Sequence, residues 1–179
     1  MAVTTPQPIA GVTPASVAEA TVANVWPSIA AGPLGRALGR LYGWRLGVRI
    51  RGVPLTIGWL MVVLTAPLAG LLFLARKAPR KPLVLFGPVN PDAVCYRLTN
   101  RGVQVVWPLE RNAAPAAAIT HADYDDVRIE VLPGQAWYPA GDVVFLHGET
   151  ERLRLAGVPR PDPFVELCRK THVAATIGR

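Results

Sequence analysis

The longest uninterrupted apolar stretch of the chain is residues 53–75, VPLTIGWLMVVLTAPLAGLLFLA, in which none of the 23 residues is charged. A helix of that length reaches roughly 35 Å, enough to cross a hydrocarbon layer of about 30 Å. Two passes would leave about 11 residues for each, which is too few to span the layer. The pattern therefore predicts one transmembrane helix, bent where Pro67 interrupts its hydrogen bonds.

A different helical pattern precedes this stretch, in residues 33–52. Apolar positions share one side of a helical wheel and Arg36 and Arg40 share the other, which is typical of a short amphipathic helix in a membrane interface. Every fourth residue is glycine, so a ridge without side chains would let another helix approach closely. The same glycines weaken a helix by up to about 1 kcal/mol each, so a flexible neck is the alternative. The apolar side holds Leu34, Leu38, Leu41 and Tyr42, and the ridge holds Gly35, Gly39, Gly43 and Gly47.

Period-two alternation begins near residue 93 and predicts a β-rich domain over residues 93–175. Asn100-Arg101-Gly102 separates two alternating runs, so a β-hairpin is expected there. Further strands are expected at residues 127–131, 142–146 and 152–155, because turn residues bound each of them. A helix with Asp162 as N-cap and an apolar stripe of Phe164, Leu167, Cys168 and Thr171 is expected to close the domain.

These elements predict an α+β protein. It would combine one transmembrane helix with a small, mostly antiparallel β-barrel or sandwich capped by a C-terminal helix. Residues 1–32 are rich in alanine and proline and predict a mobile tail. Residues 76–92 begin with basic side chains and contain four prolines, which predicts a stiff linker. Residues 110–120 are rich in alanine and are expected to form an irregular loop.

The distribution of charge changes what the composition implies. The chain has 19 Lys and Arg against 12 Asp and Glu, a net charge of +7 that would suit a nucleic-acid partner. Residues 1–52 and 53–81 each carry +4, however, and residues 82–179 carry −1. The excess brackets the apolar stretch, where it favours cytoplasmic retention and anionic headgroups, so no nucleic-acid partner is expected. The expected membrane-interface residues are Arg36, Arg40, Tyr42, Trp44, Arg76, Lys77, Arg80 and Lys81.

Four segments resemble, in order, the bacterial pleckstrin-homology-like (PH-like) domain family. They are YRLTNR at 96–101, DVRIEV at 126–131, GDVVF at 141–145 and LAGVPRP at 155–161, the last leading into the terminal helix. The resemblance covers residues 93–173. It implies a membrane-anchored binding or assembly module with a cytoplasmic domain, and its partner would be another protein or a second copy of the chain.

Candidate chemistry is sparse. His121, Asp123, Asp125 and Asp126 form the one dense cluster of possible metal ligands. No glycine-bearing calcium-loop spacing surrounds them, so a solvated turn is favoured and a metal-dependent enzyme is the least favoured alternative. No recognisable nucleophile–base set or phosphate loop occurs, and no catalytic residue, cofactor or metal is expected.

The most suggestive loop is QAWYP at residues 135–139. Exposing Trp137 and Tyr138 is costly, so they either cover the domain or contact lipid headgroups or a partner. The leading hypothesis is a single-pass membrane protein that presents a PH-like domain for protein binding, scaffolding or assembly. The alternative is a lipid-headgroup module in which Arg152 and Arg154 join the aromatic pair.

Overall fold

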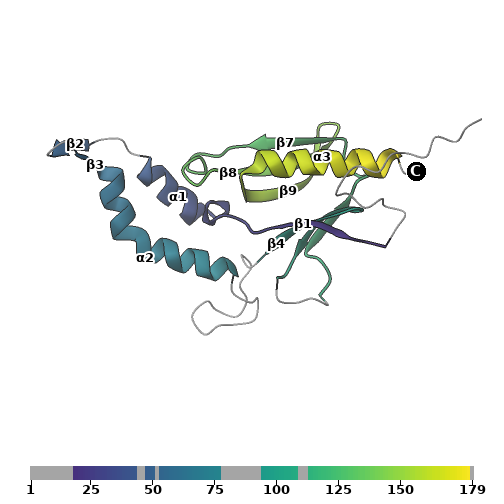
Figure 1. Cartoon of the computed structure of the whole chain (residues 1–179), viewed down its shortest axis with the longest axis horizontal. Helices are drawn as coiled ribbons and strands as arrows, with labels where there is room; N and C mark the ends of the chain where they lie inside the picture. The colour runs from purple at the N-terminus through teal and green to yellow at the C-terminus, as the bar shows by residue number, and fades with distance from the viewer. Residues whose placement is uncertain (1–17, 44–46, 51–52, 78–93, 109–112, 178–179) are drawn as a thin grey trace, which may run out of the picture.

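The structure is a computed structural model of the 179-residue chain, and it describes residues 18–43, 47–50, 53–77, 94–108 and 113–177. Two antiparallel sheets and a C-terminal helix form a β domain, and a pair of helices projects from one end of it (Figure 1).

The first sheet has the strand order β1-β4-β5-β6. Its strands are β1 (Thr21–Val25), β4 (Cys95–Thr99), β5 (Gly102–Val106) and β6 (Ala117–Thr120). β4 and β5 form the hairpin that the alternation predicts, and the Thr99 hydroxyl accepts hydrogen bonds from the turn amides of Arg101 and Gly102 at 3.2 Å each. β6 pairs with β5, so the expectation of an irregular loop is wrong for these four residues.

The second sheet and the terminal helix follow the sequence pattern closely. The sheet order is β7-β8-β9, with β7 at Asp126–Glu130, β8 at Ala140–His147 and β9 at Thr150–Pro159. The helix α3 (Pro161–Ile177) starts one residue before Asp162, which lies in its first turn instead of serving as the N-cap. The three predicted strands and the C-terminal helix are therefore confirmed.

The core lies between the two sheets and α3. Leu98, Val143 and Phe145 are fully buried, and the predicted stripe of α3 joins them through Phe164 and Cys168. Both cysteines are free and buried. The α+β class is confirmed, whereas the two sheets remain separate and do not close into a barrel.

β1 corrects the prediction of a mobile tail over residues 1–32. Val25 lies opposite Tyr96 of β4, and the Asn100 side chain accepts from the amide of Ala20 at 2.9 Å. A short 3-10 helix, η1 (Ile29–Ala31), follows β1. The partner strand lies more than 70 residues away, so no local pattern could reveal the pairing. Residues 1–17 of the expected tail lie outside the described residues.

Between β1 and β4 the chain makes a helical hairpin. It comprises α1 (Pro33–Tyr42), β2 (Gly47–Ile50), β3 (Val53–Thr56) and α2 (Ile57–Lys77), and β2 pairs with β3. Figure 1 shows this hairpin reaching away from the sheets and returning.

The hairpin corrects three boundaries that the sequence predicts. The first four residues of the apolar stretch form strand β3, which pairs with β2, so the helix starts at Ile57. The glycine ridge stops at Gly43, since Gly47 belongs to β2. Arg76 and Lys77 end α2 and do not start a linker. Trp44, Arg80, Lys81 and the remainder of the predicted linker lie outside the described residues.

α2 is long and apolar enough to cross a membrane, judged by length and composition. Its segment Gly58–Arg76 has 19 residues, a mean hydropathy of 2.1 and only 6% of its residues buried. Pro67 lies inside the helix, and the ribbon of α2 bends along its length (Figure 1). A proline in a helix interior removes one hydrogen bond and clashes with the preceding turn, which accounts for a bend there.

Candidate functional site at the hairpin junction

α1 packs backbone to backbone against the loop between β7 and β8. A Cβ placed on Gly39 would lie 2.0 Å from the carbonyl oxygen of Gly134, and a Cβ on Gly134 would lie 2.1 Å from that of Arg36. Gly134 has φ +93°, a conformation that side chains disfavour. Arg40 Nε donates to the Pro133 carbonyl at 3.3 Å. The glycine positions thus permit a close approach, but at Gly39 the partner is a loop of the domain.

The remaining ridge glycines have separate surroundings. A Cβ on Gly35 would lie 1.9 Å from the Ile29 carbonyl oxygen of η1. Gly43 caps the C-terminus of α1 and donates its amide back to the carbonyls of Gly39 and Arg40. The first turn of α1 is therefore fixed against η1, while its last turn is fixed by its own cap.

Tyr42 joins α1, α2 and the aromatic loop. Its side chain is 5% exposed, and its hydroxyl donates to Thr65 Oγ1 of α2 at 2.5 Å. Its ring lies 5.6 Å from that of Trp137 and 6.3 Å from that of Tyr138. Trp137 remains 45% exposed, while Tyr138 is half-buried. The aromatic pair thus packs on α1 with one side of the indole left open.

A buried polar network holds this loop in place. Gln135 is fully buried; its Oε1 accepts from the Leu132 amide at 2.8 Å and its Nε2 donates to Asp142 Oδ1 at 2.5 Å. The same Asp142 oxygen accepts from the Gly157 amide at 2.9 Å. One carboxylate therefore ties the loop to both β8 and β9.

The structure does not bring Arg152 to the aromatic loop, and Arg154 reaches that loop only through Asp142, 3.5 Å from Arg154 Nη1. Arg154 pairs with Glu130 and Glu151, each at 2.7 Å, and these bonds raise the pKa of its guanidinium. Arg152 is exposed beside the turn that joins β8 to β9, whereas the aromatic loop precedes the opposite end of β8. The two ends of β8 are roughly 20 Å apart at about 3.3 Å per residue.

The aspartates of the predicted metal-ligand cluster accept hydrogen bonds near turns, and its histidine is buried in the domain. Asp123 accepts from the Thr120 amide at 2.9 Å, and Asp125 accepts from the Gly148 amide at 2.8 Å. Asp126 accepts from Arg128 Nε at 2.9 Å. His121 is buried under the sheet. Within the described ranges, no group of three or more potential metal ligands gathers.

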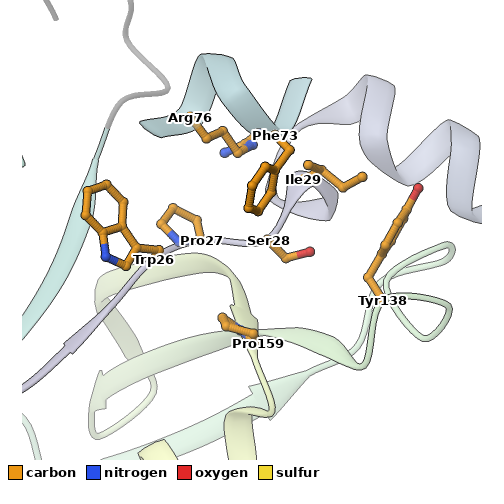
Figure 2. A pocket seen from close by; sticks show the side chains of 8 residues that line it. All are labelled: Trp26, Pro27, Ser28, Ile29, Phe73, Arg76, Tyr138 and Pro159. Carbon is orange, nitrogen blue, oxygen red and sulfur yellow. The ribbon is translucent and has the colours of Figure 1, made fainter. Parts of the chain in front are cut away.

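A cavity of about 350 Å³ opens where the hairpin meets the domain (Figure 2). Arg76 from the end of α2 lines it and is only 8% exposed. A Cβ on Gly32 would lie 2.6 Å from Arg76 Nη2, so the guanidinium lies directly over the start of α1. The other lining residues are Trp26, Pro27, Ser28, Ile29, Phe73, Tyr138 and Pro159.

Sequence reasoning missed half of this cavity. The sequence pattern places residues 26–29 in the tail, although Trp26 directly follows the β-branched TVANV run that forms β1. The same pattern predicts Arg76 at the membrane interface, and the structure shows its side chain to be 8% exposed. Recognising β1 from its valines and threonine would have placed Trp26 beside the domain.

α2 turns a narrow face to α1 and leaves the remainder open. Gly58, Thr65 and Arg76 lie on the covered side. We call the opposite side the exposed face of α2. Its most exposed large side chains are Trp59, Leu60, Val63, Leu64 and Leu74, each between 62% and 70% exposed.

Comparison with protein-family models, with curated proteins and with solved structures finds no match for this chain. The resemblance to PH-like domains therefore stays a prediction from the sequence. The junction between α1, α2 and the aromatic loop, with its cavity, is the part of the described structure from which function can be argued.

Proposed function

We propose that this protein is a membrane-anchored binding module. The exposed face of α2 lies in lipid, and the β domain is held at the membrane surface to bind a protein partner or a second copy as a scaffold or assembly factor. The observation that carries the proposal is α2 itself, since Gly58–Arg76 has a mean hydropathy of 2.1 and is 6% buried. Contiguous apolar surface of this kind is costly in water and typical of membrane or partner contact.

The strand pairing supports an attachment other than the single pass that the sequence predicts. β1 precedes the hairpin and β4 follows it, yet the two strands pair in one sheet. A single crossing by α2 would require them to be on opposite sides of the membrane. We propose instead that the chain enters and leaves on the same side, with α2 lying within one leaflet.

A second membrane crossing, through residues 33–56, would also put β1 and β4 on the same side, but it is energetically unfavourable. It would carry Arg36 and Arg40 along the membrane normal, and each Arg in the hydrocarbon centre costs about 2.5–3.5 kcal/mol on insertion scales. Arg40 instead donates to the Pro133 carbonyl of the domain loop. The basic residues around the hairpin favour the cytoplasmic side for the domain, and we place it there.

For the β domain itself, protein binding is favoured over a lipid-headgroup surface built on Arg152 and Arg154. Glu130 and Glu151 already neutralise Arg154, so only Arg152 of the predicted arginine pair has no ion pair among the described residues. Trp137 is a large exposed side chain in ring contact with Tyr42 of α1. An aromatic side chain in this position suits the headgroup layer of a membrane or the edge of a protein interface. The proposal assigns the domain a binding role with no catalytic step.

Liposome flotation of the full chain tests the anchor. The wild-type chain is expected to float with phosphatidylcholine vesicles, and the double variant Leu60→Lys/Leu64→Lys is expected to stay behind. Each Lys costs about 2.5–3.5 kcal/mol in hydrocarbon, so binding should weaken at least about tenfold. The matched control Val131→Lys/Val173→Lys changes two exposed apolar residues of the β domain and should float as the wild type does. Failure of the wild-type chain to float, or equal flotation of both double variants, would reject the proposal.

A further inference from the structure

Arg76 has a buried side chain, and the described residues supply no counter-charge for it. Its side chain is 8% exposed, and none of the hydrogen bonds or ion pairs found among the described residues involves it. Buried guanidinium groups are ordinarily paired, because taking an ion out of water costs several kcal/mol unless an opposite charge compensates. Because the described residues offer no counter-charge, an anion that enters the cavity is a candidate partner for Arg76.

The cavity beside Arg76 has the volume and the lining of a ligand site. Its volume of about 350 Å³ lies within the range of small-molecule pockets. Figure 2 shows Phe73 and Arg76 reaching from α2 over the segment that carries Trp26 and Pro27, with the Tyr138 ring forming another wall. Aromatic and apolar groups thus surround one cation, which suits an amphiphile with a negatively charged head.

The Ser28 hydroxyl is a second hydrogen-bond donor that lines the same cavity. The Ser28 hydroxyl oxygen accepts from the Ala30 amide at 3.2 Å, which leaves its proton able to donate. Ser28 and Arg76 both line the cavity. A hydroxyl and a guanidinium together fit the oxygens of a phosphate or carboxylate.

The location of the cavity indicates where the apolar part of the ligand would lie. Phe73 lines the cavity while remaining 51% exposed, and it lies on the last turns of α2. A ligand with its head on Arg76 can therefore continue past Phe73 onto the exposed face of α2, where lipid chains lie if the proposed function holds.

We propose that this cavity binds the anionic head of a membrane amphiphile, with Arg76 as the counter-charge and Ser28 as a second donor. The shared chemistry is a phosphate or carboxylate oxyanion, and the tail lies along α2. The site differs from the Arg152 and Arg154 surface and gives the anchor a preference for acidic lipid. This inference rests on the proposed membrane anchoring.

Thermal unfolding of the detergent-solubilised full chain tests the site with defined additions. Dioleoylphosphatidylglycerol and oleate are each expected to raise the Tm, because a ligand that binds the folded state stabilises it. Dioleoylphosphatidylcholine and inorganic phosphate, which separate the lipid source from a free anion, are expected to leave the Tm unchanged.

Variants of the wild-type chain assign the effect to Arg76. Arg76→Gln should weaken the phosphatidylglycerol response about tenfold in midpoint concentration, and Arg76→Lys should retain part of it. Without lipid, Arg76→Gln should unfold at a higher temperature than the wild type, because it removes an uncompensated buried charge. The matched control Arg152→Gln, at an exposed arginine, should leave the response unchanged.

Three results would each contradict the proposed site. They are a Tm increase with phosphatidylcholine equal to that with phosphatidylglycerol, a Tm increase with inorganic phosphate alone, and a full phosphatidylglycerol response in Arg76→Gln. Flotation on phosphatidylcholine vesicles is independent of acidic lipid. A wild-type chain that floats without a phosphatidylglycerol shift would therefore reject the site and leave the anchor standing, whereas a chain that does not float would reject the anchor.

Discussion

At the scale of single residues, two buried polar side chains have opposite situations. Asp142 is 2% exposed and receives hydrogen bonds from Gln135 and from the Gly157 amide. Arg76 is 8% exposed, and the described residues offer it neither a hydrogen bond nor a counter-charge. Because a buried polar group is costly unless it is paired, the first residue is expected to support the fold and the second to support a ligand.

Asp142→Ala is therefore expected to destabilise the folded state by about 2–4 kcal/mol. The change leaves the fully buried Gln135 amide and the Gly157 amide without an acceptor. Asp142→Asn keeps one acceptor oxygen and should cost roughly half as much. Denaturant unfolding of the detergent-solubilised chain measures both values. A loss below about 0.5 kcal/mol for the alanine variant, similar to Asp162→Ala on the exposed surface of α3, would contradict this account.

His121 gives the protein a pH-dependent stability. The side chain is 5% exposed, accepts from the Tyr124 hydroxyl at Nδ1 at 2.8 Å, and donates from Nε2 to the Thr99 carbonyl at 3.2 Å. Burial is the main cause that lowers the pKa of His121, and the nearby His172 lowers it further, whereas the bond to Thr99 opposes the shift. The folded state thus holds His121 neutral.

We expect the folding stability to fall as the pH drops below about 6.5, the value of an unfolded histidine, because the unfolded chain then binds more protons. His121→Gln should flatten this loss between about pH 7.5 and 5.5, a window above the range where Asp and Glu titrate. Thermal unfolding at the two pH values measures the effect. The control His147→Gln, at the exposed end of β8, should keep the wild-type pH dependence. If His121→Gln and His147→Gln show the same pH dependence, His121 is not its cause.

At the scale of elements, the sequence predicts what local chemistry determines. β4 with β5, then β7, β8, β9 and α3, follow from alternation, turn residues and an apolar stripe, and all of them form. The sequence does not predict β1, whose partner β4 lies more than 70 residues away, or β6, whose alanine-rich segment lacks clean alternation. The packing of α1 was misjudged for a related reason, since its amphipathic pattern indicates a partner without saying whether that partner is lipid or loop.

The glycine of α1 that touches the aromatic loop offers a test of this packing. Gly39→Ala would place a methyl group about 2 Å from the Gly134 carbonyl, so α1 must move and the fold is expected to lose about 1–3 kcal/mol. Trp137 should become more exposed, which red-shifts its emission. Gly70→Ala is the matched control, because a Cβ there meets nothing within 4 Å, and it should be neutral or stabilising by up to about 1 kcal/mol. Equal effects of the two substitutions would show that the contact at Gly39 is dispensable.

At the scale of the whole molecule, the chain order differs from the order in space. The sequence alone predicts a tail, helices, a linker and a β domain in chain order. That order implies one membrane crossing and a domain that is separate from the tail. The structure places β1 in the domain and inserts the hairpin between β1 and β4, so the two ends of the hairpin are joined through one sheet (Figure 1). A pairing across 70 residues is invisible to hydropathy, and it is this pairing that alters the expected relation of the protein to the membrane.

Cysteine labelling of sealed membrane vesicles distinguishes the two arrangements. Asn24→Cys places an exposed thiol on β1, before α2, and Glu149→Cys places one at the β8–β9 turn, after α2. Same-side attachment requires that a membrane-impermeant maleimide reacts with both positions or with neither in vesicles of one orientation. A single pass requires one labelled and one protected position. The unsubstituted chain is the background control, since Cys95 and Cys168 are buried. After detergent is added, the maleimide should label both positions equally. If only one of the two positions is labelled before detergent is added, the single-pass arrangement is correct and the proposed same-side attachment is wrong.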